Sequence, residues 1–298
     1  MINVTLKQLR YFDALARHKH FGRAAEACAI SQPALSQQIK ELEETIGAPL
    51  VERAARRTRL TELGEALVER LQPILLRIDE LGDLVRASKG PLSGRLRMGV
   101  IPTVAPYLLP TIMAALGKRF PDLDLELRES VTRSLIDDLL EGNLDVAIVA
   151  LPVSEPALQE LALFDEDFVL VRPKSDANKP VPSPQMLQTM RLLLLEEGHC
   201  FRDQALSFCK FNAAEPKRVM EGSSLSTLVQ MVGAGLGVTL IPEMALALEG
   251  RSANVAVTRF PAASPSRTIG MVWRRTNPLA DQLVELGDVV KRVGRAAP

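Results

Sequence analysis

The sequence predicts three parts in order: a small helical module, one long helix and a larger α/β body. Apolar residues recur every three or four positions through residues 1–60 and again through residues 62–88, which is the period of helices that bury one face. Beyond residue 95, short apolar runs suited to strands alternate with helical stretches. A chain of 298 residues is also long for a single hydrophobic core. The expected parts are residues 1–61, 62–89, a hinge at 90–94, and 95–298.

Composition limits the classes of function. The 36 Lys and Arg residues balance 36 Asp and Glu residues, no run of 18 apolar residues could cross a membrane, and the start carries no signal peptide. We therefore expect a cytoplasmic protein without a membrane partner. Three cysteines and three histidines offer no zinc-like spacing, and we expect no metal and no cofactor. Residues 1–60 hold ten basic and six acidic residues, and this basic module predicts an anionic partner, with double-stranded DNA first.

The first module predicts a helix-turn-helix. Helices are expected at about residues 5–18, 21–29 and 32–46. Ser31 suits the N-cap of the third helix, and Pro33 is tolerated in its first turn, where the missing N–H would have no partner. The third helix buries one apolar face and exposes short polar side chains that can reach base edges in a major groove.

Residues 49–61 predict a basic two-stranded wing whose arginines suit phosphates or the minor groove. The alternative is a generic three-helix domain with solvated charges. The candidate DNA contacts are Arg23, Ser31, Gln32, Pro33, Ala34, Ser36, Gln37, Lys40, Arg53, Arg56 and Arg57.

A specific motif runs through this module. It comprises Phe21-Gly22-Arg23-Ala24-Ala25, Ser31-Gln32-Pro33-Ala34-Leu35-Ser36, Ile39-Lys40-Glu41-Leu42-Glu43, Gly47, Leu50, Glu52-Arg53 and Leu60-Thr61. This pattern resembles the LysR-type transcriptional regulators. The resemblance implies a DNA-binding regulator that forms homodimers, usually paired into homotetramers, and that acts with RNA polymerase at an operator.

The long helix predicts a dimer interface. Its apolar residues step by four and three, as in a heptad seam, and a second copy is the economical partner for such a stripe. Pro73 removes one backbone hydrogen bond, so we expect a kink or break there. The seam residues are Leu67, Leu71, Ile74, Ile78, Leu81 and Val85.

The body reads as strand-helix-strand repeats, which predict a parallel α/β sheet. Ligands bind beyond the carboxyl ends of strands in such sheets. Thr103, Thr132 and Cys200 each follow a predicted strand closely, so all three could face one crevice.

Two thiols nine residues apart predict a redox switch. Cationic neighbours favour the reactive thiolate, and Cys200 has His199 before it and Arg202 two residues after it. If residues 200–209 form one helix, Cys209 lies on the opposite face and more than about 12 Å along the axis, too far for a disulfide. Pairing then requires the helix to unwind. The alternative is that both thiols are merely small buried apolar groups, which is also the role expected of Cys28.

The body carries a second set of motifs. These are Gly198-His199-Cys200, Arg202-Asp203-Gln204-Ala205, Phe208-Cys209, Ile101-Pro102-Thr103, Pro106-Tyr107-Leu108-Leu109-Pro110, Phe164-Asp165-Glu166, Ser224-Leu225 and Arg267-Thr268-Ile269-Gly270. They resemble the hydrogen-peroxide-sensing members of the same family. The family has a winged helix-turn-helix, a linker helix and two α/β lobes like those of periplasmic binding proteins, here lobe I at about 95–165 and 266–298 and lobe II at about 166–265.

This resemblance implies that hydrogen peroxide oxidises Cys200 to a sulfenic acid, which forms a disulfide with Cys209, and that refolding then alters DNA binding and activates antioxidant genes. It places Thr103, Thr132, His199, Arg267 and Asp203 around the peroxide. Helix capping is the alternative role for Thr132 and Asp203.

Two other functions are compatible with the sequence. One is a family member that binds a small organic effector between its lobes, with incidental cysteines. The other is a thiol peroxidase, but an enzyme has little use for a helix-turn-helix and a dimerisation helix, so we expect no enzymatic role.

Overall fold

The computed structural model describes residues 3–52, 58–88, 90–208, 219–261 and 264–296. The chain forms two compact units, Met1–Gly82 and Asp83–Pro298. Four predicted site residues, Arg53, Arg56, Arg57 and Cys209, lie outside the described residues. No helix in the described ranges is both long and apolar enough to cross a membrane.

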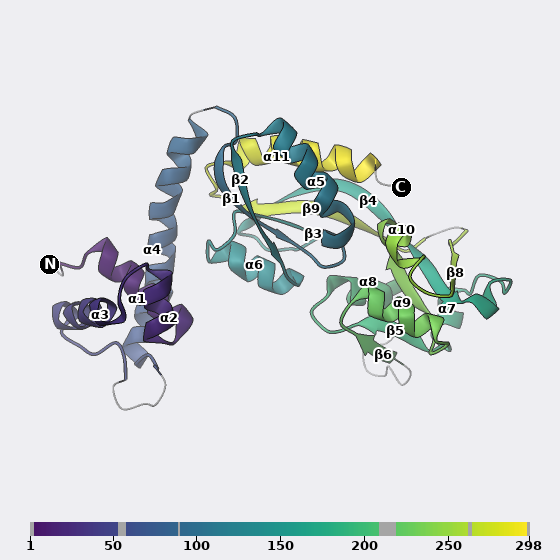
Figure 1. The fold of residues 1–298 in the computed structure, drawn as a ribbon, viewed down its shortest axis with the longest axis horizontal. Coiled ribbons are helices and arrows are strands. Elements are labelled where there is room, and N and C mark those ends of the chain that lie inside the picture. Colours follow the sequence, from purple (N-terminus) through teal and green to yellow (C-terminus); the bar gives the residue numbers. More distant parts are fainter. Residues whose placement is uncertain (1–2, 53–57, 89, 209–218, 262–263, 297–298) are drawn as a thin grey trace. The chain divides into compact units, whose positions relative to one another are not determined.

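The N-terminal unit has the predicted helix-turn-helix (Figure 1). Its helices are α1 (Leu6–His18), α2 (Phe21–Ala27), α3 (Gln32–Ile46) and the first part of α4 (Glu62–Ala87). The helices close over a core that includes the fully buried Phe12, Leu15, Leu35 and Leu42. The predicted cap at Ser31 is confirmed, because its side chain accepts a hydrogen bond from the backbone N–H of Ala34.

A buried carboxylate organises the segment that follows α3. Glu43 Oε1 accepts hydrogen bonds from the backbone N–H groups of Leu50 and Val51, at 2.7 and 3.1 Å. Val51 then pairs with Leu60 in an antiparallel bridge, which is the base of the predicted wing. The wing tip lies outside the described residues.

Helix α4 differs from the prediction in two ways. It runs unbroken through Pro73, so the expected break is absent. Leu71 and Leu75 on either side of the proline are buried in the core of the N-terminal unit, and this packing offsets the lost hydrogen bond. Leu71 is therefore buried by its own chain and is not available to a second copy. The exposed part of the seam begins at Ile74 and includes Leu81 and Val85.

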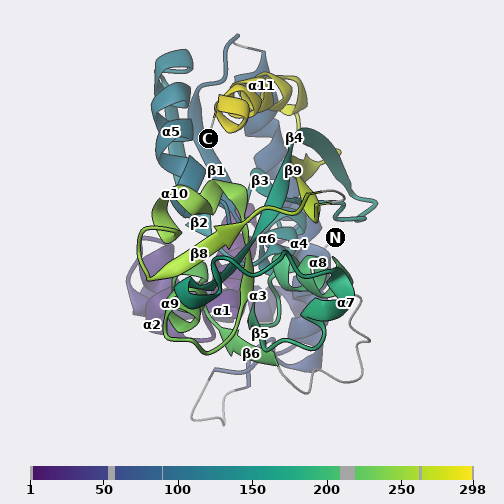
Figure 2. The ribbon, with the colours of Figure 1, turned by 90° about the vertical axis from the view of Figure 1, so that its right-hand side faces the viewer.

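The second unit is built on a sheet in the order β2-β1-β3-β9-β4-β7, with β8 paired to β4 (Figures 1 and 2). Helices α5 and α11 lie on one side of the first four strands and α6 lies on the other. Their shared core includes Trp273 and Phe120. The bounds are β1 (Gly94–Val100), α5 (Ala105–Arg119), β2 (Leu123–Glu129), α6 (Thr132–Leu140), β3 (Val146–Leu151), β4 (Leu158–Pro173), β9 (Ser266–Arg274) and α11 (Ala280–Ala296).

The rest of this unit packs around a second core that includes Phe168, Phe201 and Leu194. The long strand β4 belongs to both parts, because its first half pairs with β9 and its second half with β7 and β8. The remaining bounds are η1 (Lys174–Asp176), α7 (Pro184–Leu187), β5 (Leu192–Leu195), α8 (Cys200–Phe208), β6 (Val219–Gly222), α9 (Leu225–Gly233), β7 (Thr239–Pro242), η2 (Glu243–Ala245), α10 (Leu246–Glu249) and β8 (Val255–Thr258).

The prediction of a parallel sheet is wrong for four of the seven strand pairings in the described residues. Strand β1 pairs in parallel with β2 and β3, and β5 pairs in parallel with β6, but β9, β4, β7 and β8 pair with their neighbours antiparallel. The two long strands β4 and β9 connect the two cores, and this is the two-lobed arrangement that the resemblance implies. The exact lobe boundaries stay a prediction.

Candidate functional site

The thiol of Cys200 lies at the first residue of α8. It is half-buried and packs against the first core of the second unit, which is the core built on β1, β3 and β9. The preceding Gly198 has φ of +95°, a conformation that glycine adopts without strain. A Cβ at Gly198 would lie 3.7 Å from Val131, so the start of α8 lies beside the start of α6.

A cavity of about 410 Å³ lies between the two cores. Of the predicted pocket residues, Thr103 and His199 line it, whereas Thr132, Asp203 and Arg267 do not, and neither does Cys200, the predicted redox residue. Asp203 is exposed on α8. The structure thus brings part of the predicted set to one cavity and leaves Asp203 on the surface.

Arg267 is the centre of a buried polar network. Its side chain is fully buried and pairs with Glu166, the residue directly opposite on β4, with 2.8 Å between Nε and Oε2. Its Nη1 donates to Thr103 Oγ1 at 2.7 Å and its Nη2 donates to the Thr103 carbonyl at 3.0 Å. Burial raises the pKa of Glu166, and the Arg267 charge opposes that rise. Because Thr103 Oγ1 already accepts from Arg267, its own proton is left to donate elsewhere.

Thr132 is the first residue of α6, but it is not the cap. Val131 holds the N-cap position, and no side-chain cap hydrogen bond forms there, so the capping role considered for Thr132 is wrong. Thr132 Oγ1 is buried, and no hydrogen-bond partner lies among the described residues. A buried hydroxyl without a partner costs free energy, which a small polar ligand would recover.

The two expected cationic neighbours of the thiol, His199 and Arg202, offer it no free positive charge. Burial lowers the pKa of His199, and Glu196 only partly opposes this, so the imidazole is neutral near pH 7. Arg202 donates to Glu221 at 2.6 Å and to the Leu195 carbonyl at 3.1 Å. Neither side chain supplies the free positive charge that their positions in the sequence suggested.

Sequence reasoning missed two groups in the cavity wall. Tyr107 on α5 and Ser226 on α9 both donate to Glu249 Oε1, at 2.9 and 2.7 Å. Burial and Glu249 both raise the pKa of Tyr107, so the phenol stays protonated and remains a donor. Tyr107 lies in a motif that the resemblance used, but no local signal marked the buried Glu249 as its partner.

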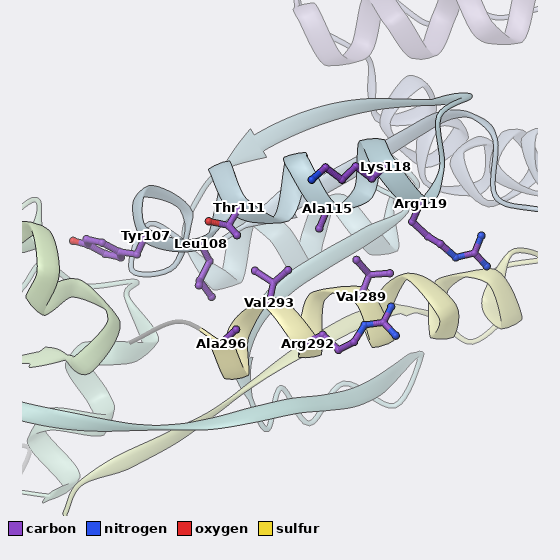
Figure 3. A pocket seen from close by; sticks show the side chains of 10 residues that line it. All are labelled: Tyr107, Leu108, Thr111, Ala115, Lys118, Arg119, Val289, Arg292, Val293 and Ala296. Carbon is purple, nitrogen blue, oxygen red and sulfur yellow. The ribbon is translucent and has the colours of Figure 1, made fainter.

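A larger groove of about 680 Å³ runs between α5 and α11 (Figure 3). Side chains of Lys118, Arg119 and Arg292 rim it, and Leu108 and Val293 lie along its apolar part. It contains none of the predicted site residues. The candidate site is therefore defined by the thiol and the arginine network and not by the volume of a cavity.

The predicted DNA-contacting residues that the structure describes all lie on the surface of the N-terminal unit. Arg23 on α2 donates to the His18 carbonyl at 3.0 Å. On α3, Gln37 donates to Glu41 and Lys40 pairs with Glu44, so both make exposed contacts that water or DNA could replace. His20, which sequence reasoning overlooked, caps α2 through its Nδ1.

Comparisons with known proteins match both parts of the chain to one family. Residues 6–65 match the family model described as bacterial regulatory helix-turn-helix protein, lysR family, and residues 89–295 match the LysR substrate binding domain. A probable hydrogen peroxide-inducible genes activator from Streptomyces viridosporus is 42% identical over 99% of this chain and 96% of its own length. The DNA-binding transcriptional dual regulator OxyR of Escherichia coli K12 is 38% identical over 97% of this chain and 95% of its own length.

Two solved structures are similar as well. A full-length OxyR variant from Pseudomonas aeruginosa, with cysteine replaced by aspartate, has a TM-score of 0.76 and 37% identity, and covers 97% of this chain and 95% of that one. A hydrogen-peroxide-bound OxyR variant from Corynebacterium glutamicum, with cysteine replaced by serine, has a TM-score of 0.68 and 34% identity, and covers 99% of this chain and 94% of that one.

Proposed function

Because this chain belongs to the LysR family of transcriptional regulators, we propose that it senses hydrogen peroxide through Cys200 and Cys209 and reports the oxidation by a change in DNA binding. The family consists of DNA-binding regulators and not of enzymes. The names of the relatives support hydrogen peroxide as the signal and activation as the response. RNA polymerase and a second copy of the chain are the proposed partners at the promoter.

The proposed chemistry has two balanced steps. The Cys200 thiolate attacks one oxygen of hydrogen peroxide, the O–O bond breaks, and a sulfenic acid and hydroxide form. The Cys209 thiol then attacks the sulfenic sulfur, the S–S bond forms, and water leaves. Thr103, with its hydroxyl proton free to donate, and Thr132, with its unpartnered Oγ1, are the proposed peroxide contacts.

The intact helix α8 is the observation that carries this proposal. It spans Cys200–Phe208, and eight helical steps of about 1.5 Å separate their Cα atoms by roughly 12 Å. Cys209 is bonded to Phe208, whose Cα is about 3.8 Å away, so the two cysteine Cα atoms are at least about 8 Å apart whatever Cys209 does. A disulfide needs roughly 7 Å or less. Closure therefore requires α8 to unwind, which makes the disulfide a structural signal.

A sub-stoichiometric pulse of hydrogen peroxide followed by mass spectrometry tests this function. We expect a peptide pair joined through Cys200 and Cys209, no such pair in Cys200→Ser, and a persistent sulfenic acid in Cys209→Ser. Cys28 is the internal control, since burial raises the pKa of its thiol and it should stay reduced. Unmodified Cys200 in the wild type would overturn the proposal.

One observation favours a second candidate. The cavity of about 410 Å³ is of the size that holds small organic ligands and exceeds what hydrogen peroxide needs. An organic effector with incidental cysteines would leave Cys200 unmodified in the same pulse, so that experiment separates the two functions.

A further inference from the structure

Phe201, the residue after the sensor thiol, is held by two neighbours. It is 1% exposed. Its ring meets Phe168 on β4 edge to face, with 4.8 Å between centroids. The Arg267 guanidinium lies 5.7 Å from the same ring centroid. Aromatic pairs and desolvated cation–π contacts both stabilise a folded segment beyond the area they bury.

The first turn of α8 thus has two different attachments. Cys200 packs against the first core, whereas Phe201 belongs to the second. The partners of Phe201 are fixed independently of α8. Arg267 is held by Glu166 and Thr103, and Phe168 lies within β4, where it is paired with Pro242 of β7. If α8 opens, Phe201 moves away from Arg267 and Phe168, and these two residues keep their positions.

We propose that Phe201 is a positioning residue of the sensor: its ring docks the first turn of α8 onto Arg267 and Phe168 and so opposes closure of the Cys200–Cys209 disulfide. This inference rests on the proposed function. Phe201 lies inside the loop that the disulfide closes, and opening the first turn removes both of its contacts. The ring therefore stabilises the dithiol form and sets how oxidising the surroundings must be before the switch closes.

The expected effect is a change in the redox equilibrium. Loss of one aromatic pair and one buried cation–π contact corresponds to roughly a tenfold change. The equilibrium is the exchange of the disulfide with two glutathione molecules, which gives the dithiol and one glutathione disulfide. In Phe201→Leu the disulfide should be roughly tenfold harder to reduce, which is a midpoint potential more negative by about 30 mV.

The experiment compares four full-length proteins: the wild type, Phe201→Leu, Phe201→Met and Phe208→Leu. Each is equilibrated in buffers with graded ratios of glutathione to glutathione disulfide, and its free thiols are then alkylated and counted. Phe208 is the matched control, because it lies on the same helix and meets Phe260 edge to face at 5.2 Å, but no described guanidinium lies over its ring. Phe201→Met also removes the ring, but its unbranched, adaptable side chain fills an irregular gap better than leucine, so it serves if the leucine variant folds poorly. Thermal unfolding of each reduced variant checks folding.

We expect both Phe201 variants to shift by about 30 mV and Phe208→Leu by less than about a third of that. A Phe201 variant that titrates like the wild type, or a Phe208 variant that shifts as far, would overturn this inference and leave the sensor function standing. A wild type that forms no disulfide at any ratio would overturn both.

Discussion

The charged environment of Cys200 is set by residues that are close in space and not by its neighbours in the sequence. His199 and Arg202 are its neighbours in sequence, yet the first is neutral and the second is paired with Glu221. The buried cation of this region is Arg267, 67 residues away in the sequence. The resemblance found Arg267, but its partner Glu166 was not predicted, because only the β4–β9 register places the two side chains opposite each other.

Thr132→Val separates a ligand contact from a structural one. The Thr132 hydroxyl has no described partner, so its replacement by an isosteric methyl should leave the free energy of unfolding unchanged or slightly raised. Removing one hydrogen bond to the peroxide should slow Cys200 oxidation by roughly tenfold. Stopped-flow oxidation kinetics and urea unfolding measure the two quantities.

Thr103→Val is the matched comparison. Loss of the Thr103 hydroxyl leaves the buried Arg267 Nη1 without that hydrogen-bond acceptor. The substitution should therefore lower the free energy of unfolding by about 1–3 kcal/mol and also slow the oxidation of Cys200. Equal losses of stability in the two variants would contradict the assignment of Thr132 as a ligand contact.

His199 should make the free energy of unfolding of the reduced protein fall as the pH is lowered. Burial lowers the pKa of His199 in the folded state, so between that value and about 6.5 the unfolded chain binds a proton that the folded chain does not. Stability is therefore fully present above about pH 6.5 and falls as the pH decreases toward the folded pKa. His199→Gln should remove this part of the fall, as urea unfolding between pH 5.5 and 7.5 would measure. A wild type that gains stability relative to the variant on acidification would contradict the assignment.

At the scale of elements, most helices and parallel strands were predictable and strand direction was not. The apolar periods of α1 and α3, together with the Ser31 cap of α3, gave their positions closely. The pleated pattern of a strand has no direction, so β9 and β4 were indistinguishable from parallel strands. The short strands β6 and β8 have four residues each and too few apolar positions to show a period.

Helix α4 has a divided apolar stripe. Leu71 and Leu75 close the core of the N-terminal unit, whereas Leu81 and Val85, one turn apart, are 62% and 55% exposed. The heptad period predicted the whole stripe as an intermolecular seam, because the spacing alone does not say which partner covers it. The exposed part remains the proposed dimer contact.

Leu81→Glu tests that contact. A buried unpaired carboxylate costs several kcal/mol, so the dimer dissociation constant should rise by roughly a hundredfold or more. Leu63→Glu is the control, since Leu63 is also exposed on α4 but lies off the heptad. Sedimentation at graded concentrations gives both constants, and equal effects of the two substitutions would remove α4 as the dimer seam.

At the scale of the whole molecule, the proposed chemistry and the DNA contacts lie in different units. The thiol and the arginine network belong to residues 83–298, and the described DNA-contacting candidates belong to residues 1–82. Helix α4 is the element that enters both, since the boundary between the units falls within it. In the proposed mechanism, a change in how two copies of residues 83–298 associate would reach the DNA through this helix.

Footprinting of the full-length wild type on a promoter fragment that it binds, first reduced and then oxidised with hydrogen peroxide, tests the central claim most directly. The oxidised protein should protect a shifted or shortened region, and a thiol reductant should restore the original footprint. Cys209→Ser, which cannot close the disulfide, should keep the reduced footprint after the same treatment. Identical wild-type footprints, with the Cys200–Cys209 disulfide shown to be complete in the same sample, would contradict the account.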